Sequence, residues 1–299
     1  MNYNSTIRYS ILIALAATVS SCGSTASDNE NVAGTDTAAN INSGKDTKAQ
    51  NVFYSIPSPI ETTSLLKAAG AKYNASYLNP IENVSKYSTA ASRALNLGIY
   101  GSDLSFTSIF DQTQESMLYL RCTNKLATSL GISGAFDEST TSRIESNLEN
   151  RDSLLTIISD SYWNADSYLK ENGQPGVSAL IIAGGWIEGL YIATKIAADT
   201  KNADIVTRIG EQKLSLDNLV ALLESYKSSN EGVNDMYNQF SELKKIYDTI
   251  PAKPSETTTS TDKKSGVTTI GNNSNYTLTP EQLKAITDKA NQIRNKVIQ

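Results

Sequence analysis

The feature that most constrains the fold is a 22-residue apolar run, Val177–Ala198, which reads VSALIIAGGWIEGLYIATKIAA. This run is too long for a buried strand of about 4–8 residues and has the length of a helix. Pro175 and Gly176 precede it. Proline is favoured in a first helical turn because the amide that it lacks has no helical partner there. The run therefore predicts the central helix of an all-helical domain.

Three glycines lie within this run: Gly184, Gly185 and Gly189. Each costs about 1 kcal/mol relative to alanine inside a helix, so we expect a second helix backbone to pass very close to them. A membrane span is the alternative, since about 20 apolar residues cross a bilayer. Glu188 would be costly in the middle of a span, and the flanking segments are amphipathic, so a water-soluble bundle is favoured.

Residues 1–21 are predicted to be a targeting segment, with Arg8 before a short apolar core. The sequence VSSC at 19–22 resembles the lipobox of bacterial lipoproteins, in which the signal is cut before the cysteine. The resemblance implies attachment of acyl chains such as palmitate to Cys22 and an anchor in the cell envelope. A plain secretory signal with a chance cysteine is the alternative.

Residues 22–50 carry almost no large apolar side chains, so we expect a lipidated, disordered tether. The acids Asp28 and Glu30 resemble, loosely, the surface-export signals of lipoproteins in Bacteroidota. This resemblance points to the outer membrane and leaves open which side the protein faces.

The body of the chain, residues 51–250, shows apolar residues at three- and four-residue spacing and no sustained alternation of two. We predict one all-α domain, an up-and-down helical bundle or array. Asp137 and Ser215 are the expected caps of its fourth and sixth helices. The predicted helices cover 61–73, 80–110, 112–130, 137–172, 177–198, 216–226 and 231–247.

An internal repeat is one interpretation of this body. At an offset of 85 positions, Ala94-Leu95 matches Ala179-Leu180 and Asp103 matches Glu188. One explanation is chance similarity between two apolar helices. The other is a duplicated helical hairpin that places the two acids at equivalent inward positions.

Residues 251–276 are rich in Ser, Thr, Lys and Asn and are predicted to be a flexible linker. Residues 277–299 then predict a separate amphipathic helix, with Thr279 as cap, Pro280 in the first turn and Gln282 completing a capping box. An isolated helix of this length is marginal in water. It therefore docks on the body, pairs with another copy or meets a partner, and docking is favoured.

The residue types exclude several chemistries. The chain has no histidine, and lipidation of Cys22 would leave Cys122 as the single free cysteine, which we expect to be buried. We find no glycine-rich phosphate loop, dinucleotide fingerprint or metal-ligand spacing. We therefore expect no cofactor and no metal site, and we do not expect an enzyme.

Asp103 and Glu188 are the candidate polar site, since each lies in an apolar helix beside aromatic residues: Tyr100 for the first, and Trp186 and Tyr191 for the second. A buried acid must be paired or protonated. A structural core acid is the favoured interpretation, a ligand contact is the next, and a catalytic carboxylate pair as in glycoside hydrolysis is the last. The expected partners are Arg93, Arg121, Arg143 and Arg151.

Charge excludes one class of partner. Removing residues 1–21 removes only Arg8 from the 26 bases and none of the 31 acids, so the mature chain has 25 bases against 31 acids and a net charge of −6. No basic run is present, so we expect no nucleic-acid binding.

The lipobox, the sequence YGSDL at 100–104 and the sequence GGWIEGLY at 184–191 together resemble a group of uncharacterised helical lipoproteins of Bacteroidota over about residues 50–250. The resemblance implies location and fold but no activity. We therefore expect a lipid-anchored, non-catalytic envelope protein that binds another protein or assembles with itself. The alternative is a binding protein for a lipid, glycan or peptide, with a pocket near Asp103, Trp186 and Glu188.

Overall fold

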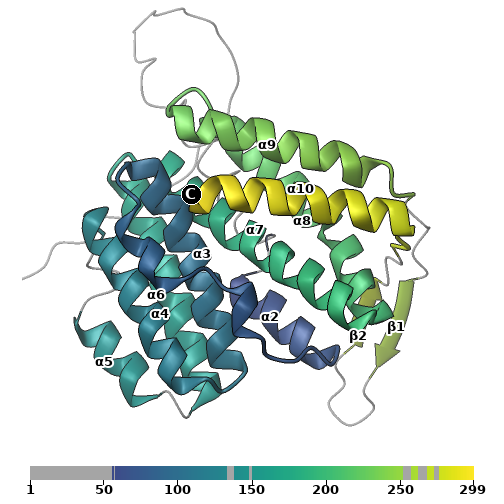
Figure 1. The fold of residues 1–299 in the computed structure, drawn as a ribbon, viewed down its shortest axis with the longest axis horizontal. Coiled ribbons are helices and arrows are strands. Elements are labelled where there is room, and N and C mark those ends of the chain that lie inside the picture. Colours follow the sequence, from purple (N-terminus) through teal and green to yellow (C-terminus); the bar gives the residue numbers. More distant parts are fainter. Residues whose placement is uncertain are drawn as a thin grey trace, which may run out of the picture. The chain divides into compact units, whose positions relative to one another are not determined.

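The computed structural model describes residues 56, 58–132, 138–147, 150–251, 257–261, 268–272 and 276–299. Their fold is all-α, as predicted, and Figure 1 shows the helices. The α-helices are α2 (Pro59–Ala68), α3 (Ala90–Ile109), α4 (Thr113–Ser129), α5 (Glu138–Ser146), α6 (Arg151–Glu171), α7 (Pro175–Thr200), α8 (Ala203–Tyr226), α9 (Glu231–Asp248) and α10 (Pro280–Ile298). The predicted targeting segment and tether, including Cys22, lie outside the described residues.

Helix α7 is the central helix that the sequence predicts. It contacts α2, α3, α6, α8, α9 and α10 (Figure 1). Among the described helices it is the one with the length and apolar composition to cross a membrane, and 89% of its most apolar window is buried inside the protein. The surrounding helices, rather than lipid, cover this surface.

The predicted close approach of a second helix backbone is confirmed for α3. A Cβ atom added to Gly184 would lie 1.9 Å from the carbonyl oxygen of Leu95, and one added to Gly98 would lie 2.0 Å from that of Ile181. Gly185 and Gly189 have different nearest neighbours, because side chains of α2 lie 3.1–3.3 Å from their added Cβ atoms. Close contact between α3 and α7 thus requires glycine at positions 98 and 184.

Two helices predicted as continuous are interrupted. Residues 80–110 form a 3-10 turn, η2 (Ile81–Ser85), and then α3, because Thr89 and Ser92 form a capping box that starts a new helix. Residues 137–172 form α5 and α6, with Asn150 capping α6. The expected cap Asp137 lies outside the described residues. A second 3-10 turn, η1 (Ala75–Tyr77), precedes η2.

The predicted cap at Ser215 is wrong. Helix α8 begins twelve residues earlier, at Ala203, where the side chain of Asn202 accepts a hydrogen bond from Asp204 N. Ser215 lies inside α8, and its hydroxyl accepts a hydrogen bond from Trp186 of α7. A serine inside a helix and a capping serine both place a hydroxyl before apolar residues, so local sequence does not distinguish them.

A short antiparallel hairpin lies within the predicted flexible linker. Its strands are β1 (Thr257–Thr261) and β2 (Thr268–Asn272), and Thr259 pairs with Ile270 at its centre. The prediction that the body, residues 51–250, lacks strands does not cover this segment, and the sequence pattern did not predict the hairpin. The runs of threonine, a β-branched residue, account for the extended conformation.

Helix α10 is not a separate body, because it packs on α7 and α9 (Figure 1). Its capping box at Thr279 and Gln282 forms as predicted. Ile286, Ala290 and Ile293 of its apolar stripe are fully buried. The sequence left three arrangements open for this helix, and the structure shows the favoured one, docking on the body.

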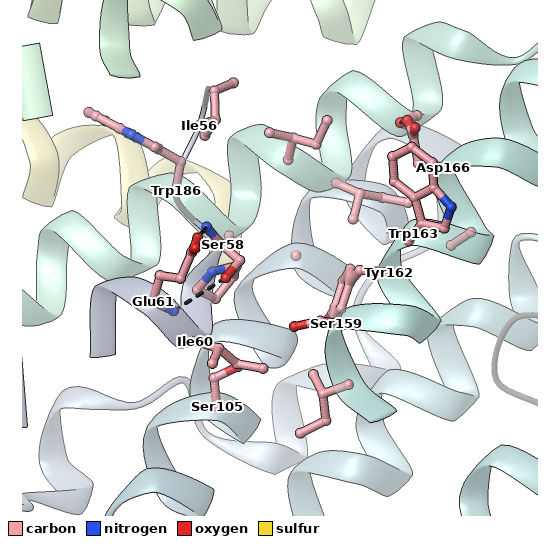
Figure 2. Close-up of a pocket in the computed structure, with 18 of the residues that line it drawn as sticks. Ile56, Ser58, Ile60, Glu61, Ser105, Ser159, Tyr162, Trp163, Asp166 and Trp186 are labelled. Atoms are coloured by element: carbon pink, nitrogen blue, oxygen red, sulfur yellow. Dashed lines mark hydrogen bonds between the residues drawn. The ribbon is translucent and has the colours of Figure 1, made fainter. Parts of the chain in front are cut away.

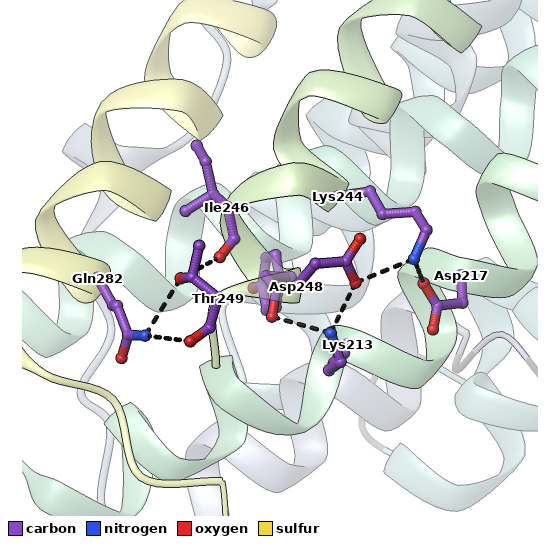
Figure 3. Close-up of polar contacts among 8 residues, drawn as sticks. Lys213, Asp217, Lys244, Ile246, Asp248, Thr249 and Gln282 are labelled. Atoms are coloured by element: carbon purple, nitrogen blue, oxygen red, sulfur yellow. Dashed lines mark hydrogen bonds and ion pairs between the residues drawn. The ribbon is translucent and has the colours of Figure 1, made fainter. Parts of the chain in front are cut away.

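Polar contacts hold the end of α9 against α8 and against the start of α10 (Figure 3). Lys213 of α8 and Lys244 of α9 both form ion pairs with Asp248, at 2.8 and 3.1 Å. Gln282 donates a hydrogen bond of 2.9 Å to the carbonyl oxygen of Thr249 at the end of α9. Gln282, which completes the capping box of α10, therefore also ties that helix to its neighbour.

Candidate functional site

The structure brings the two predicted acids together. Asp103 of α3 and Glu188 of α7 are both fully buried, and their carboxyl groups lie within hydrogen-bonding distance of each other. The glycine contact between the two helices makes this approach possible, because it brings the backbones close enough for two short acidic side chains to meet.

The positive partner of this pair is Arg294 of α10. It is not one of the four arginines that the sequence suggested. Its Nε and Nη2 atoms donate hydrogen bonds of 3.0 Å to the two carboxylate oxygens of Glu188. Such a two-point contact is the strongest geometry for an arginine and a carboxylate. Arg93, one of the four expected partners, instead donates to the carbonyl oxygens of Tyr87 and Ser129.

Of the two acids, Asp103 is the one whose surroundings more strongly favour the protonated form. Burial, and then the neighbouring charge of Glu188, raise the pKa of Asp103 well above its ordinary value. Burial also raises the pKa of Glu188, but the charge and hydrogen bonds of Arg294 oppose this rise. Oδ2 of Asp103 accepts a hydrogen bond from Asn79 N, whereas Oδ1 has no donor among the described residues. A protonated Asp103 donating to the Glu188 carboxylate makes the cluster electrically neutral.

Of the aromatic residues predicted beside the acids, Tyr191 joins the cluster directly. Its ring lies 4.3 Å from the guanidinium carbon of Arg294, a cation–π contact. Tyr100 is buried nearby, where it donates to the carbonyl oxygen of Pro80 and packs against Tyr87. These contacts are internal, so the cluster is a polar part of the core.

Trp186 faces a different part of the molecule. Its indole N–H donates a 3.0 Å hydrogen bond to Ser215, and its ring packs edge-on against Phe240 at 5.7 Å. Trp186 also lines a pocket of about 400 Å³, whose described lining excludes Tyr100, Asp103, Glu188 and Tyr191. The predicted site therefore divides into a closed charge cluster and an adjacent pocket.

This pocket lies between the start of α2 and the helices α6 and α7. Figure 2 shows Ser58 and Glu61 on one side and Tyr162, Trp163 and Asp166 of α6 on the other. Isoleucines from α6 and α7 supply much of its apolar wall: Ile158, Ile181 and Ile182. Its volume falls within the range of about 300–1,000 Å³ that is usual for small-molecule sites.

Hydrogen bonds fix several of the polar groups in the pocket. Tyr162 donates to the carbonyl oxygen of Leu97 at 3.1 Å. Asp166 is nearly buried and accepts hydrogen bonds from Ser178 and from Lys170, the latter at 2.7 Å. These groups are held in place without a ligand, as expected for a largely preformed site.

Apolar spacing places Ile158 and Tyr162 on one face of the helix predicted over 137–172, but that face does not include Trp163. Trp163 is one of the two tryptophans in the chain and is half-buried beside that face. A large aromatic residue at the edge of an apolar stripe was the available signal, because such residues are common where a helix borders a binding surface.

Neither site offers the ligands of a metal centre. No group of three or more His, Cys, Asp or Glu residues that could hold a metal ion occurs in the part of the chain that the structure describes. Cys122 is buried, and burial raises the pKa of its thiol to about 11. A thiol of this kind is a poor nucleophile at neutral pH.

Comparison of the chain with protein-family models, curated proteins and solved structures found no match.

Proposed function

We propose that this protein is a lipid-anchored binding protein of the bacterial cell envelope that holds a small ligand in the pocket between α2, α6 and α7. The observation that carries the proposal is the pocket itself, with a volume of about 400 Å³ and a largely apolar wall. An unfilled apolar pocket costs free energy because its lining lacks packing partners. A bound apolar group would recover those contacts.

A non-catalytic role is supported by the closed state of the charge cluster. Asp103 and Glu188 are the carboxylate pair that the sequence suggested for hydrolysis, and Glu188 already has both carboxylate oxygens bonded to Arg294. A catalytic acid must reach the substrate, and neither of these residues lines the pocket. We therefore place ligand binding above catalysis.

A protein partner is the second candidate, which the sequence alone favours through the tether. The described surface has four exposed large apolar side chains, of which Leu214 is the most exposed at 65%. They lie on four different helices, and single exposed apolar residues are ordinary on protein surfaces. The pocket is the more specific feature, so a small ligand is the leading proposal.

The binding proposal is tested by purifying the protein from its own envelope without denaturation and analysing the small molecules that it carries. Ser159 lies exposed at the pocket wall, so Ser159→Trp fills the site from its rim. We expect a compound in near-stoichiometric amount with the wild type and much less with the variant. Equal amounts from both proteins would overturn the proposal.

The anchor is tested separately with Cys22→Ala, for which the lipobox resemblance predicts loss of acylation. Several acyl chains each add about 0.8 kcal/mol of membrane affinity per buried methylene. We expect the variant to keep an uncleaved signal or to leave the membrane fraction after cleavage, as judged by fractionation and intact mass. A cleaved Cys22→Ala chain that stayed with the membrane would contradict the lipid anchor.

A further inference from the structure

The charged groups that line the pocket are all negative. Glu61, Asp160 and Asp166 contribute carboxylates, and no lysine or arginine is among the described lining residues. Asp166 is paired with Lys170 just outside the lining. Glu61 and Asp160 form no ion pair within the described parts of the chain. Two carboxylates therefore face this pocket without a positive partner.

The position of Glu61 is fixed by the start of α2. Its Oε2 atom accepts a 2.7 Å hydrogen bond from the backbone N–H of Ser58, and the Ser58 hydroxyl accepts one from Glu61 N. This capping box holds the carboxylate at the pocket rim, where Figure 2 shows its hydrogen bonds. A carboxylate held in place before binding loses little side-chain entropy when a ligand arrives.

On the other side of the pocket, α6 places an aromatic ring close to an acid. Asp160 and Trp163 both line the pocket and lie three residues apart, so they share one helix face. Indole is the side chain with the strongest attraction for a cation over its face. An acid and an indole on the same face favour a positive group at that point.

We propose that the ligand is a small organic cation, with an apolar part against the isoleucines of α6 and α7 and a protonated amine or quaternary ammonium near Glu61, Asp160 and Trp163. This inference rests on the proposed binding function and adds the chemical class of the ligand. A free carboxylate or phosphate would meet like charges without a base to pair with it. The pocket volume is that of a small-molecule site, so a small molecule is the occupant.

Three probes of similar size and different charge test the inference: benzyltrimethylammonium, benzyl alcohol and phenylacetate. Both tryptophans of the chain line the pocket, so their fluorescence reports binding to the full-length mature protein, and calorimetry gives the dissociation constants. We expect the cation to bind about tenfold more tightly than phenylacetate at low salt, with the alcohol between them. The difference shrinks at about 1 M salt, where the screening length is about 3 Å.

Variants assign this preference to residues. Glu61→Gln keeps the capping box, because glutamine fills the same position, while it removes the charge. We expect Glu61→Gln and Asp160→Asn each to weaken binding of the cation about threefold and to leave benzyl alcohol unaffected. Trp163→Phe should weaken binding of the cation, and Trp186 then remains as the fluorescent reporter. Glu231→Gln changes another exposed first-turn glutamate, one that is not among the lining residues, and is the matched control.

The outcomes separate the inference from the proposed function. If none of the three probes binds, both are overturned. If benzyl alcohol binds but phenylacetate binds as tightly as the cation, the pocket is a binding site and the charge inference fails. A preference for the cation that survives both Glu61→Gln and Asp160→Asn would also overturn the assignment.

Discussion

At the residue scale, the buried acids Asp103 and Glu188 differ in how strongly each favours its protonated form, because Arg294 forms an ion pair with Glu188. Arg294 neutralises Glu188, whereas Asp103 meets the negative charge of Glu188 and a single backbone amide, that of Asn79. A buried carboxylate can remain charged when a positive group is paired with it, and it favours the protonated form when no such partner is present. Arg294 therefore favours the charged form of Glu188, whereas burial beside Glu188 favours the protonated form of Asp103.

This difference predicts a pH effect for Asp103→Asn. The native pKa of Asp103 is raised, so above its ordinary unfolded value of about 3.9 the native state holds a proton that the unfolded chain releases. Stability from this group is thus lost as the pH rises from about 4 towards the native pKa. Asparagine has no such proton, and its amide can donate to Glu188 in the same place.

We therefore expect the free energy of unfolding of Asp103→Asn, relative to that of the wild type, to increase with pH. Urea unfolding of both proteins at several pH values measures this difference. A difference between the two proteins that is the same at every pH would show that Asp103 is ionised in the folded state.

At the element scale, glycine placement determines how closely α3 and α7 approach. Gly184 faces the Leu95 carbonyl group, a backbone atom that cannot turn aside, whereas Gly189 faces a side-chain methyl of Thr62 at 3.3 Å. Both positions are helical, so alanine would be favoured over glycine at each by about 1 kcal/mol if space were the same.

These two positions form a matched pair of variants. We expect Gly184→Ala to lower the free energy of unfolding by about 3 kcal/mol or more, since the helices must separate and the core repack. Gly189→Ala should change it by less than about 1 kcal/mol. Thermal or urea unfolding measures both, and equal effects would show that the close approach at Gly184 does not form.

The sequence allowed the helices to be predicted better than their ends. Apolar spacing identified α4 and α9 within one residue, because periodicity is a local property. The break at Thr89 and the start of α8 at Asn202 depend on hydrogen bonds between backbone and side chain that several residues compete to make. Such competition is decided by tertiary packing.

At the scale of the whole molecule, α10 completes the core. The sequence predicted that Glu188 is buried and that residues 277–299 form an amphipathic helix, but it did not connect them. Arg294 lies 106 positions from Glu188, and nothing in local spacing relates the two. The pocket likewise could not be predicted, because its walls come from α2, α6 and α7 and depend on how these helices pack.

The most direct test of this account is a double-mutant cycle on Glu188 and Arg294, measured by urea unfolding of the wild type, Glu188→Gln, Arg294→Gln and the double variant. Each single change leaves a buried charge without its partner, so each should lower the free energy of unfolding by about 3 kcal/mol. The double variant should cost about 2 kcal/mol less than the sum of the two. Effects that add would contradict the account, because they would mean that α10 does not place Arg294 against Glu188.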